Sequence, residues 1–301
     1  MSPAPIILFC YKRIDTLDLT IQSLKKCPEA KYSDLVIYSD APANDSLTDK
    51  VKNVREFIKN VVGFKSIEII ERPNNLGVDF NIIDGLKEVA NRFDKFIIIE
   101  DDIIVKPDCL TFFNSCLDYY NDNLKIMSIS AFPYLDSVPK SYQYDAFFAG
   151  RENPWGWATW SDRIKSVDWY LGDKESFLQS KKLQAEFSKW GSDMGLMLKN
   201  TINGKIRAWD IRLDYHIYKH DMVVVYSTIP LTVNIGFGRD DSSNTFGYNR
   251  FKSELNSVIK LKFNLPDSIF FEKEIVKEFI FKNSLILRIF TRIMKLIGYK
   301  N

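Results

Sequence analysis

The first 120 residues alternate between short apolar runs and segments with helical spacing. The apolar runs are rich in β-forming residues and lie at 5–12, 34–42, 66–77 and 96–100. The segments between them repeat apolar side chains every three to four residues, at 15–27, 49–62 and 79–93. Alternation of this kind predicts an α/β fold, in which helices cover both faces of a mainly parallel sheet.

The composition sets further limits. A chain of 301 residues with 46% hydrophobic and 14% aromatic content can bury one large core or two fused halves. A net charge of +2 gives no indication of nucleic-acid binding. Four scattered cysteines and two histidines argue against a structural zinc site. No signal-peptide pattern and no apolar stretch of ~20 residues occurs, so we expect a cytoplasmic protein, soluble or peripheral on the inner face of the membrane.

Polar residues stand at the carboxyl ends of the predicted strands, where ligands bind in sheets of this kind. Basic groups and amides suit a pyrophosphate, and a carboxylate accepts from a base N–H or a sugar hydroxyl. The pattern therefore predicts a nucleotide pocket. Its candidate residues are Arg13 after the first strand, Asp40 after the second, and Arg72 and Asn75 after the third.

Three consecutive acids, Glu100, Asp101 and Asp102, interrupt an apolar run at the end of the fourth strand. Alternation along an extended strand would place Glu100 and Asp102 on one face and Asp101 on the other. Neighbouring carboxylates repel each other unless a cation lies among them. Oxygen ligands without a nearby His or Cys suit Mn²⁺ or Mg²⁺. In the alternative interpretation the acids face water, or one of them caps a helix that begins near Pro107.

The chain resembles the GT-A glycosyltransferases, including N-acetylglucosaminyltransferase I and bacterial sugar transferases related to it. The similar segments cover about residues 5–245 and include PIILFCYKRIDTL, RPNNLGVDFNIIDGL, IEDDIIVKPDCLTFF, RENPWGWATWSDR and the block from GSDMGLML to VNIGF. The resemblance implies a GT-A fold, Rossmann-like, with a mixed and mainly parallel sheet. It also implies transfer of a sugar from a nucleotide-sugar, with Mn²⁺ or Mg²⁺ as cofactor.

The resemblance implies roles for individual residues. Asp102 would bind the metal directly, and Glu100 and Asp101 would hold sugar and ribose hydroxyls. The nucleotide and its pyrophosphate would contact Arg13, Asp40, Arg72 and Asn75.

Aromatic residues cluster at Trp155, Trp157 and Trp160. Aromatic faces stack on the C–H surface of sugar rings, so Trp155 and Trp157 are candidate substrate contacts, whereas we expect Trp160 to lie in the core. The glycine-containing segment 233–245 is predicted to be a mobile loop whose Arg239 reaches a phosphate when the loop closes.

An inverting transfer needs a general base to take a proton from the acceptor hydroxyl. The candidates outside the acid triplet are Asp193 and Asp210. Asp193 matches an acid just ahead of a helix in the related family and ranks first, although the same position suits a helix N-cap. His216 and His220 lie four residues apart without an adjacent Glu, and we interpret them as structural or surface residues.

The C-terminal residues 266–301 are rich in apolar and basic side chains. The helical spacing separates a polar face from an apolar one, as in basic amphipathic helices on anionic membranes. A helix docked on the catalytic domain or on a second subunit would show the same spacing. We predict a catalytic domain over 1–265, with a nucleotide-binding part at about 1–106 and an acceptor-binding part at about 107–265, and a helical tail over 266–301. The polar face contains Ser284, Arg288, Thr291, Arg292 and Lys295, and the apolar face contains Ile286, Ile289, Phe290, Ile293, Leu296 and Ile297.

The sequence as a whole predicts a metal-dependent, inverting glycosyltransferase. Its donor would be a nucleotide-sugar, UDP-linked by resemblance, carrying a hexose or N-acetylhexosamine. Its acceptor would be a glycan or glycolipid in bacterial surface polysaccharide synthesis. A sugar-phosphate nucleotidyltransferase is an alternative, but it would open with a Gly-rich loop, and YKRIDTLD has no glycine. A non-catalytic carbohydrate-binding protein is a second alternative that would have no use for the acid triplet.

Overall fold

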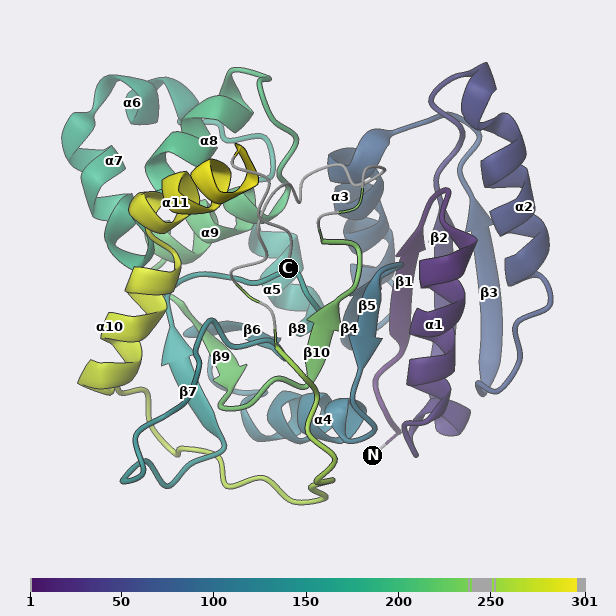
Figure 1. Cartoon of the computed structure of the whole chain (residues 1–301), viewed down its shortest axis with the longest axis horizontal. Coiled ribbons are helices and arrows are strands. Elements are labelled where there is room, and N and C mark those ends of the chain that lie inside the picture. The colour runs from purple at the N-terminus through teal and green to yellow at the C-terminus, as the bar shows by residue number, and fades with distance from the viewer. Residues whose placement is uncertain (1, 238, 240–250, 252, 297–301) are drawn as a thin grey trace.

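A computed structural model describes residues 2–237, 239, 251 and 253–296 of the chain. In this part of the chain eight strands form one mixed sheet in the order β3-β2-β1-β4-β8-β6-β9-β7, and two short strands, β5 and β10, form a second sheet (Figure 1). In the larger sheet β7 and β8 run opposite to the other strands. The strands are β1 Ile6–Cys10, β2 Asp34–Ser39, β3 Ser66–Glu71, β4 Lys95–Glu100, β5 Ile103–Val105, β6 Ile126–Ser130, β7 Ala146–Ala149, β8 Trp157–Trp160, β9 Val223–Ser227 and β10 Thr232–Asn234.

Helices flank the sheet, so the predicted fold class, a mainly parallel mixed sheet with helices and a helical C-terminal tail, is confirmed. The chain crosses from β1 to β2 to β3 in one direction and then returns past β1 to β4. Because such crossovers are right-handed, α1 and α2 cover one face and α3 covers the other. The helices are α1 Ile14–Lys25, α2 Thr48–Ile58, α3 Gly77–Ala90, α4 Cys109–Tyr119, α5 Ser161–Ser166, α6 Lys174–Gln179, α7 Lys181–Phe187, α8 Met194–Ile202, α9 Asp210–Lys219, α10 Lys273–Lys282 and α11 Leu285–Leu296.

The central strands are apolar along their whole length because helices cover both of their faces. All residues of β1 are buried, and so are Phe96–Ile99 of β4. At the edge of the sheet, β3 instead mixes exposed and half-buried side chains. The continuous apolar runs in the sequence therefore correspond to the middle of the sheet.

The tryptophan-rich segment forms a central strand. β8 lies antiparallel between β4 and β6, with Trp157 opposite Ile98 and Trp160 opposite Lys95. The prediction that Trp160 belongs to the core is confirmed, since its side chain is buried and its Nε1 donates to the Leu117 carbonyl at 3.1 Å. The predicted nucleotide-binding and acceptor-binding parts therefore share one sheet.

The C-terminal tail forms two helices. α10 buries Ile275 and Phe279 against the main core, where Phe279 lies edge-on to Tyr226 with ring centroids 5.3 Å apart. α11 follows after Asn283 and Ser284. Among the residues that the structure describes, no helix combines the length and the apolar character needed to cross a bilayer.

A buried ion pair fixes a long loop to the sheet. Lys106 follows β5 and donates through Nζ to Asp108 Oδ2 at 2.8 Å and to the carbonyl of Val258. The same Asp108 oxygen accepts from the backbone N–H of Lys260 at 2.7 Å. Both partners are nearly inaccessible, with side chains 1% and 0% exposed. The pair therefore connects the segment around residue 260 to the start of α4.

We predict that Lys106→Met lowers the free energy of unfolding by about 3–5 kcal/mol, because it leaves the Asp108 carboxylate buried without its cation. Urea denaturation measures this change. The matched control is Lys65→Met, which removes an ion pair to Asp34 whose lysine side chain is 56% exposed. The control should cost less than about 1 kcal/mol. Equal losses in the two variants would contradict the prediction.

Candidate functional site at the end of the parallel strands

The direction of the crossovers reverses between β1 and β4, and in open α/β sheets ligands bind outside the carboxyl ends of the strands at such a point. β1 and β4 are parallel neighbours, and Phe9 lies opposite Glu100 in register. The segment that leaves β1 contains Arg13, and the segment that leaves β4 contains Asp101 and Asp102. The sheet thus brings together the basic residue and the acids that the sequence placed at two strand ends.

One arginine joins two of the three acids. Arg13 Nη2 lies 2.5 Å from Asp101 Oδ1 and 2.8 Å from Asp102 Oδ2. The backbone N–H of Tyr11 also donates to Asp101 Oδ2 at 3.2 Å. The expectation that Asp101 and Asp102 point to opposite faces is wrong, because β4 ends at Glu100 and the two aspartates lie in a turn. Both carboxylates can therefore meet the same cation.

A distant segment covers this cluster. β10 pairs antiparallel with β5, which places Asn234 opposite Ile103. Asn234 Nδ2 lies 3.5 Å from Asp102 Oδ1, and the N–H of Ile235 donates to the Asp102 carbonyl at 2.9 Å. A Cβ on Gly236 would overlap the Asp102 carboxylate, so only glycine allows this close approach. The strand pairing therefore brings the VNIGF segment to the acid triplet.

The predicted loop 233–245 is described only at 233–237 and 239, and its other residues lie outside the described part of the chain. Arg239 Nη1 contacts Asp15 Oδ2, in the first turn of α1, at 2.7 Å. Its predicted role as a phosphate contact stays a prediction.

The environment of Glu100 and Asp101 resists the ionisation of these two side chains. Burial raises the pKa of Glu100 well above its ordinary value, and the charges of Asp102 and Asp101 raise it further. Burial likewise raises the pKa of Asp101 to about 6, although the guanidinium of Arg13 opposes the change. One guanidinium facing three carboxylates leaves the cluster short of positive charge. A further cation would relieve this deficit.

The donor set fits a hard divalent cation. In the described residues no group of three His, Cys, Asp or Glu side chains forms a ready metal cage. Mg²⁺ and similar ions do not need one, because they bind through one or two carboxylates together with substrate phosphates and water. Asp102, with its partner Asp101, offers oxygen ligands of that kind. Arg13 occupies the position beside the two carboxylates where a cation would neutralise them.

Asp40 organises the loop that leads into α3. Its carboxylate accepts from the N–H groups of Ala41, Leu76 and Gly77 at 2.9, 3.0 and 2.9 Å, and from Asn75 Nδ2 at 3.1 Å. It is buried, and it satisfies donors at the start of α3 that the helix itself leaves unpaired. Asp40 and Asn75 therefore hold the shape of the loop, and their predicted contacts with a nucleotide stay predictions.

Arg72 lies beside the same helix. Its Nη1 contacts Glu88 Oε1 at 2.6 Å, its Nε donates to Asn81 Oδ1 at 3.2 Å, and its guanidinium covers the ring of Tyr38 at 4.9 Å. These partners connect β3 to α3. The predicted pyrophosphate contact of Arg72 is likewise untested.

A second charged group surrounds Arg151, which sequence reasoning did not single out although it opens the RENPWGWATW segment. Its Nη1 contacts Asp193 Oδ1 at 2.6 Å, and Arg288 Nε from α11 contacts Asp193 Oδ2 at 2.6 Å. Asp193 occupies the N-cap position of α8, but its side chain makes no capping hydrogen bond and is 1% exposed. Each oxygen of Asp193 therefore faces an arginine.

Asp210 begins α9 and is only partly buried. Burial raises its pKa, while the positive charges of Arg151 and Arg288 act in the opposite direction. Its own charge raises the pKa values of Glu100 and Glu152. Asp210 therefore lies within electrostatic reach of both the acid triplet and the group around Arg151.

The two candidate sugar-binding tryptophans differ in position. Trp157 is fully buried and stacks on Trp209 with ring centroids 5.3 Å apart, which leaves it no surface for a sugar. Trp155 is 9% exposed and lies edge-on to Phe237 and Phe132. Trp155 adjoins the segment that covers Asp102 through Phe237, and its predicted substrate contact stays a prediction.

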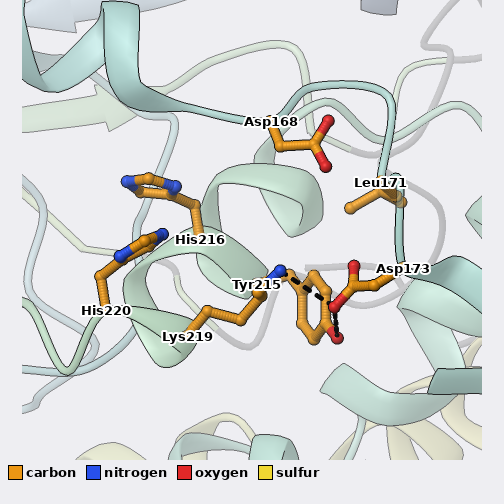
Figure 2. Close-up of a pocket in the computed structure, with 7 residues that line it drawn as sticks. All are labelled: Asp168, Leu171, Asp173, Tyr215, His216, Lys219 and His220. Carbon is orange, nitrogen blue, oxygen red and sulfur yellow. Dashed lines mark hydrogen bonds and ion pairs between the residues drawn. The ribbon is translucent and has the colours of Figure 1, made fainter. Parts of the chain in front are cut away.

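The two histidines lie at the other end of α9, beside a small cavity (Figure 2). His216 is buried and its Nε2 lies 3.2 Å from Ser166 Oγ, whereas His220 is exposed, with the two ring centroids 4.2 Å apart. Burial lowers the pKa of His216 to about 4. The cavity of about 20 Å³ has room for a water molecule but not for a sugar or nucleotide. A second, more open cavity of about 350 Å³ also lies against both histidines. His216 is buried and His220 is exposed, and their interpretation as structural or surface residues stays a prediction.

No protein-family model matches the chain, and no curated protein matches it. Two solved structures share part of its fold at 11% sequence identity. One is S. aureus TarS, with a TM-score of 0.43 over 75% of this chain and 37% of that chain. The other is the mannosyltransferase PcManGT from Pyrobaculum calidifontis in complex with GDP-Man and Mn²⁺, with a TM-score of 0.41 over 73% of this chain and 70% of that chain. The chain thus spans little more than a third of TarS, and similarity at this level carries no argument about function.

The titration of Glu152 tests whether burial keeps this carboxyl group protonated near neutral pH. It is 1% exposed, accepts from Ser128 Oγ and from the N–H of Asn153 at 2.9 Å, and burial raises its pKa to about 8. The folded protein therefore binds more protons than the unfolded chain between about pH 4.5 and pH 8. The stability that this proton provides is complete below that window and is lost as the pH rises through it.

We predict that the free energy of unfolding falls as the pH rises from 6 to 8, with Glu152 contributing about 1.4 kcal/mol per pH unit. Urea denaturation at several pH values measures the slope. In Glu152→Gln the slope should become shallower, because glutamine does not titrate. The exposed variant Glu56→Gln should keep the wild-type slope. An unchanged slope in Glu152→Gln would show that Glu152 is already ionised at pH 7.

Proposed function

We propose that the chain is a metal-dependent glycosyltransferase of the GT-A type that moves a sugar from a nucleotide-sugar to a hydroxyl group of a glycan. The observation that carries the proposal is the cluster of Arg13, Asp101 and Asp102 at the point where the crossovers reverse. A carboxylate pair beside an arginine suits a ligand that brings a divalent cation and phosphates together. The close approach of Gly236 to Asp102 adds a backbone wall to that site.

On the donor side Asp102 would hold the cation, and Glu100 and Asp101 would accept from sugar and ribose hydroxyls. Arg13, which pairs with both aspartates, would face the diphosphate of the donor. When bound, the metal ion stabilises the negative charge that develops on the departing diphosphate. We assign Trp155 and Arg239, from the segments beside β8 and β10, to substrate contacts on this side of the site. Asp40 and Asn75 shape the loop at the start of α3 where the nucleotide lies.

On the acceptor side we propose Asp210 as the general base. The sequence ranked Asp193 first, but both Asp193 oxygens contact an arginine and its side chain is 1% exposed, which leaves little room for an acceptor hydroxyl. Asp210 is partly accessible, and its raised pKa brings it closer to neutral pH, where a base works best. Asp210 takes the proton of the acceptor hydroxyl, and Asp193 positions Arg151.

The finer features follow the sequence resemblance. They are an inverting outcome, a UDP-linked hexose or N-acetylhexosamine as donor, and a glycan or glycolipid of a bacterial surface polysaccharide as acceptor. The alternatives make different demands on the acid triplet. A lectin would bind sugar without regard to Mn²⁺, and a nucleotidyltransferase would bind a nucleoside triphosphate and a sugar phosphate.

We predict that wild-type protein binds a nucleotide-sugar from a UDP and GDP panel in the presence of Mn²⁺ and loses at least tenfold in affinity after chelation. Asp102→Asn should lose the Mn²⁺-dependent part, because it removes a charged ligand and leaves Arg13 unpaired on that side. Isothermal titration calorimetry measures both effects. Asp34→Asn, at the far end of β2, is the control and should bind like wild type. Equal binding with and without Mn²⁺ would refute the metal-dependent function.

A second prediction distinguishes between the two candidate bases, Asp210 and Asp193. Asp210→Asn should keep donor affinity within about twofold and lower the transfer rate at least ~100-fold, the usual contribution of a general base. Asp193→Asn should lower the thermal midpoint, because it weakens a buried ion pair, and keep the rate within about tenfold of wild type. Transfer assays and thermal unfolding on the same preparations measure both quantities. The reverse pattern of rates would make Asp193 the base.

A further inference from the structure

Helix α11 lies against the protein with its polar side inward. Arg288 Nε contacts Asp193 Oδ2 at 2.6 Å, and Thr291, one turn further on, is 5% exposed. The N–H of Leu285 at the start of the helix donates to Ser192 Oγ at 2.9 Å. These contacts attach α11 to the N-terminus of α8, and Figure 1 shows it at the outer side of the helices around α8 and α9.

The apolar side of α11 points outward. Ile286, Ile289, Phe290 and Ile293 follow one another at intervals of three, one and three residues, and are 77%, 49%, 49% and 50% exposed. We call these four residues the α11 apolar face. A surface helix of a globular protein normally turns such a stripe toward the core. In α11 the arrangement is reversed, so the apolar face is available to a partner outside the chain.

The predicted assignment of residues to the two sides of this helix agrees with the structure where side chains are described. Arg288 and Thr291 are on the inner side, and the α11 apolar face is on the outer side. The predicted polar residues Arg292 and Lys295 and the predicted apolar residues Leu296 and Ile297 lie outside the described side chains.

The positive charge of residues 279–301 favours an anionic partner. Residues 279–301 contain five basic residues and no acid. Lys282 pairs with Asp136 and Arg288 with Asp193, so Arg292, Lys295 and Lys300 carry the rest of the positive charge. A second copy of the chain placed symmetrically on the same face would bring two basic segments together, which like-charge repulsion opposes. An anionic lipid surface accepts apolar side chains among its acyl chains and basic side chains among its headgroups.

The length of the helix determines how it meets a bilayer. α11 has 12 residues and is about 18 Å long, whereas the hydrocarbon core of a bilayer is about 30 Å thick. A helix of this length lies along the surface. Arg288, on the inner side of the helix, contacts Asp193. The lipid surface would therefore be about one helix diameter, ~10 Å, from the Asp193 carboxylate.

We propose that α11 docks the protein on an anionic bilayer surface through its apolar face, and that this places the acceptor side of the site next to the lipid headgroups. The consequence for the substrate rests on the proposed function. An acceptor reaching this side of the site is a glycan carried on a lipid anchored in the same bilayer. Arg288 acts as a positioning residue that sets the distance between the membrane-bound helix and Asp193.

The test is co-sedimentation of the full chain with vesicles of phosphatidylcholine alone and with vesicles that contain 30% phosphatidylglycerol. The expected result is binding to the anionic vesicles, weakened at least tenfold by high salt or by neutral lipid. Ile286→Glu with Phe290→Glu should lower the partition coefficient at least tenfold. The matched control is Val62→Glu with Leu124→Glu, which adds the same charges at two apolar residues that are each 66% exposed, and it should bind like wild type.

Three results would overturn the proposal. They are no binding of wild type to anionic vesicles, equal binding of the α11 variant and wild type, and a wild-type dimer that the α11 variant converts to monomer, which would assign the face to a second copy. Circular dichroism checks that each variant is folded. Mn²⁺-dependent binding of the nucleotide-sugar panel, measured on the same variants without vesicles, separates the two hypotheses. Loss of vesicle binding with intact donor binding in the α11 variant would assign vesicle binding to α11. Absence of donor binding in wild type would contradict the proposed function and leave the membrane proposal unaffected.

Discussion

Charge compensation at the ends of β1 and β4 is the constraint on which the candidate site depends. Glu100 ends the strand β4 and Asp101 and Asp102 follow it, and Arg13, just beyond β1, pairs with both aspartates. The arrangement exists because β1 and β4 are adjacent and parallel, so that their carboxyl ends meet. The residual negative charge is the basis of the proposed site for a cation and its phosphate ligands. The short sheet of β5 and β10 then brings Gly236 against the same carboxylates.

A second electrostatic centre organises the other half of the molecule. Arg151 lies among carboxylates from separate helices, and Arg288 adds a contact from the C-terminal tail. Buried ion pairs of this kind contribute little net stability, because desolvation offsets the attraction, but removing one partner is costly. They therefore specify geometry, here the position of α8, α9 and α11 around one point. Asp210 links this centre to the acid triplet through its charge.

Local pattern was sufficient for the first part of the fold. The runs at 5–12 and 96–100 became β1 and β4 because continuous apolar residues suit strands that are covered on both sides, and the intervening periodic segments became α1, α2 and α3. The insertion of β8 between β4 and β6 left no signal in the sequence, since the partners of a strand are set by contacts far along the chain. For the same reason Trp157, a candidate sugar contact in the sequence, proved to be buried against Trp209.

The sequence by itself determined which residue types stand at the strand ends, because apolar periodicity and the position of charged residues are local properties. It also determined that the tail is amphipathic, since the polar and apolar residues of 284–297 repeat at helical spacing. Only the tertiary structure decided that Arg13 neutralises two aspartates, that Asp193 is held by two arginines and Asp210 is not buried to the same degree, and that α11 turns its polar side inward. Each of these depends on side chains from distant segments meeting at short range, where the Coulomb energy and the loss of hydration are both large enough to choose one partner over another.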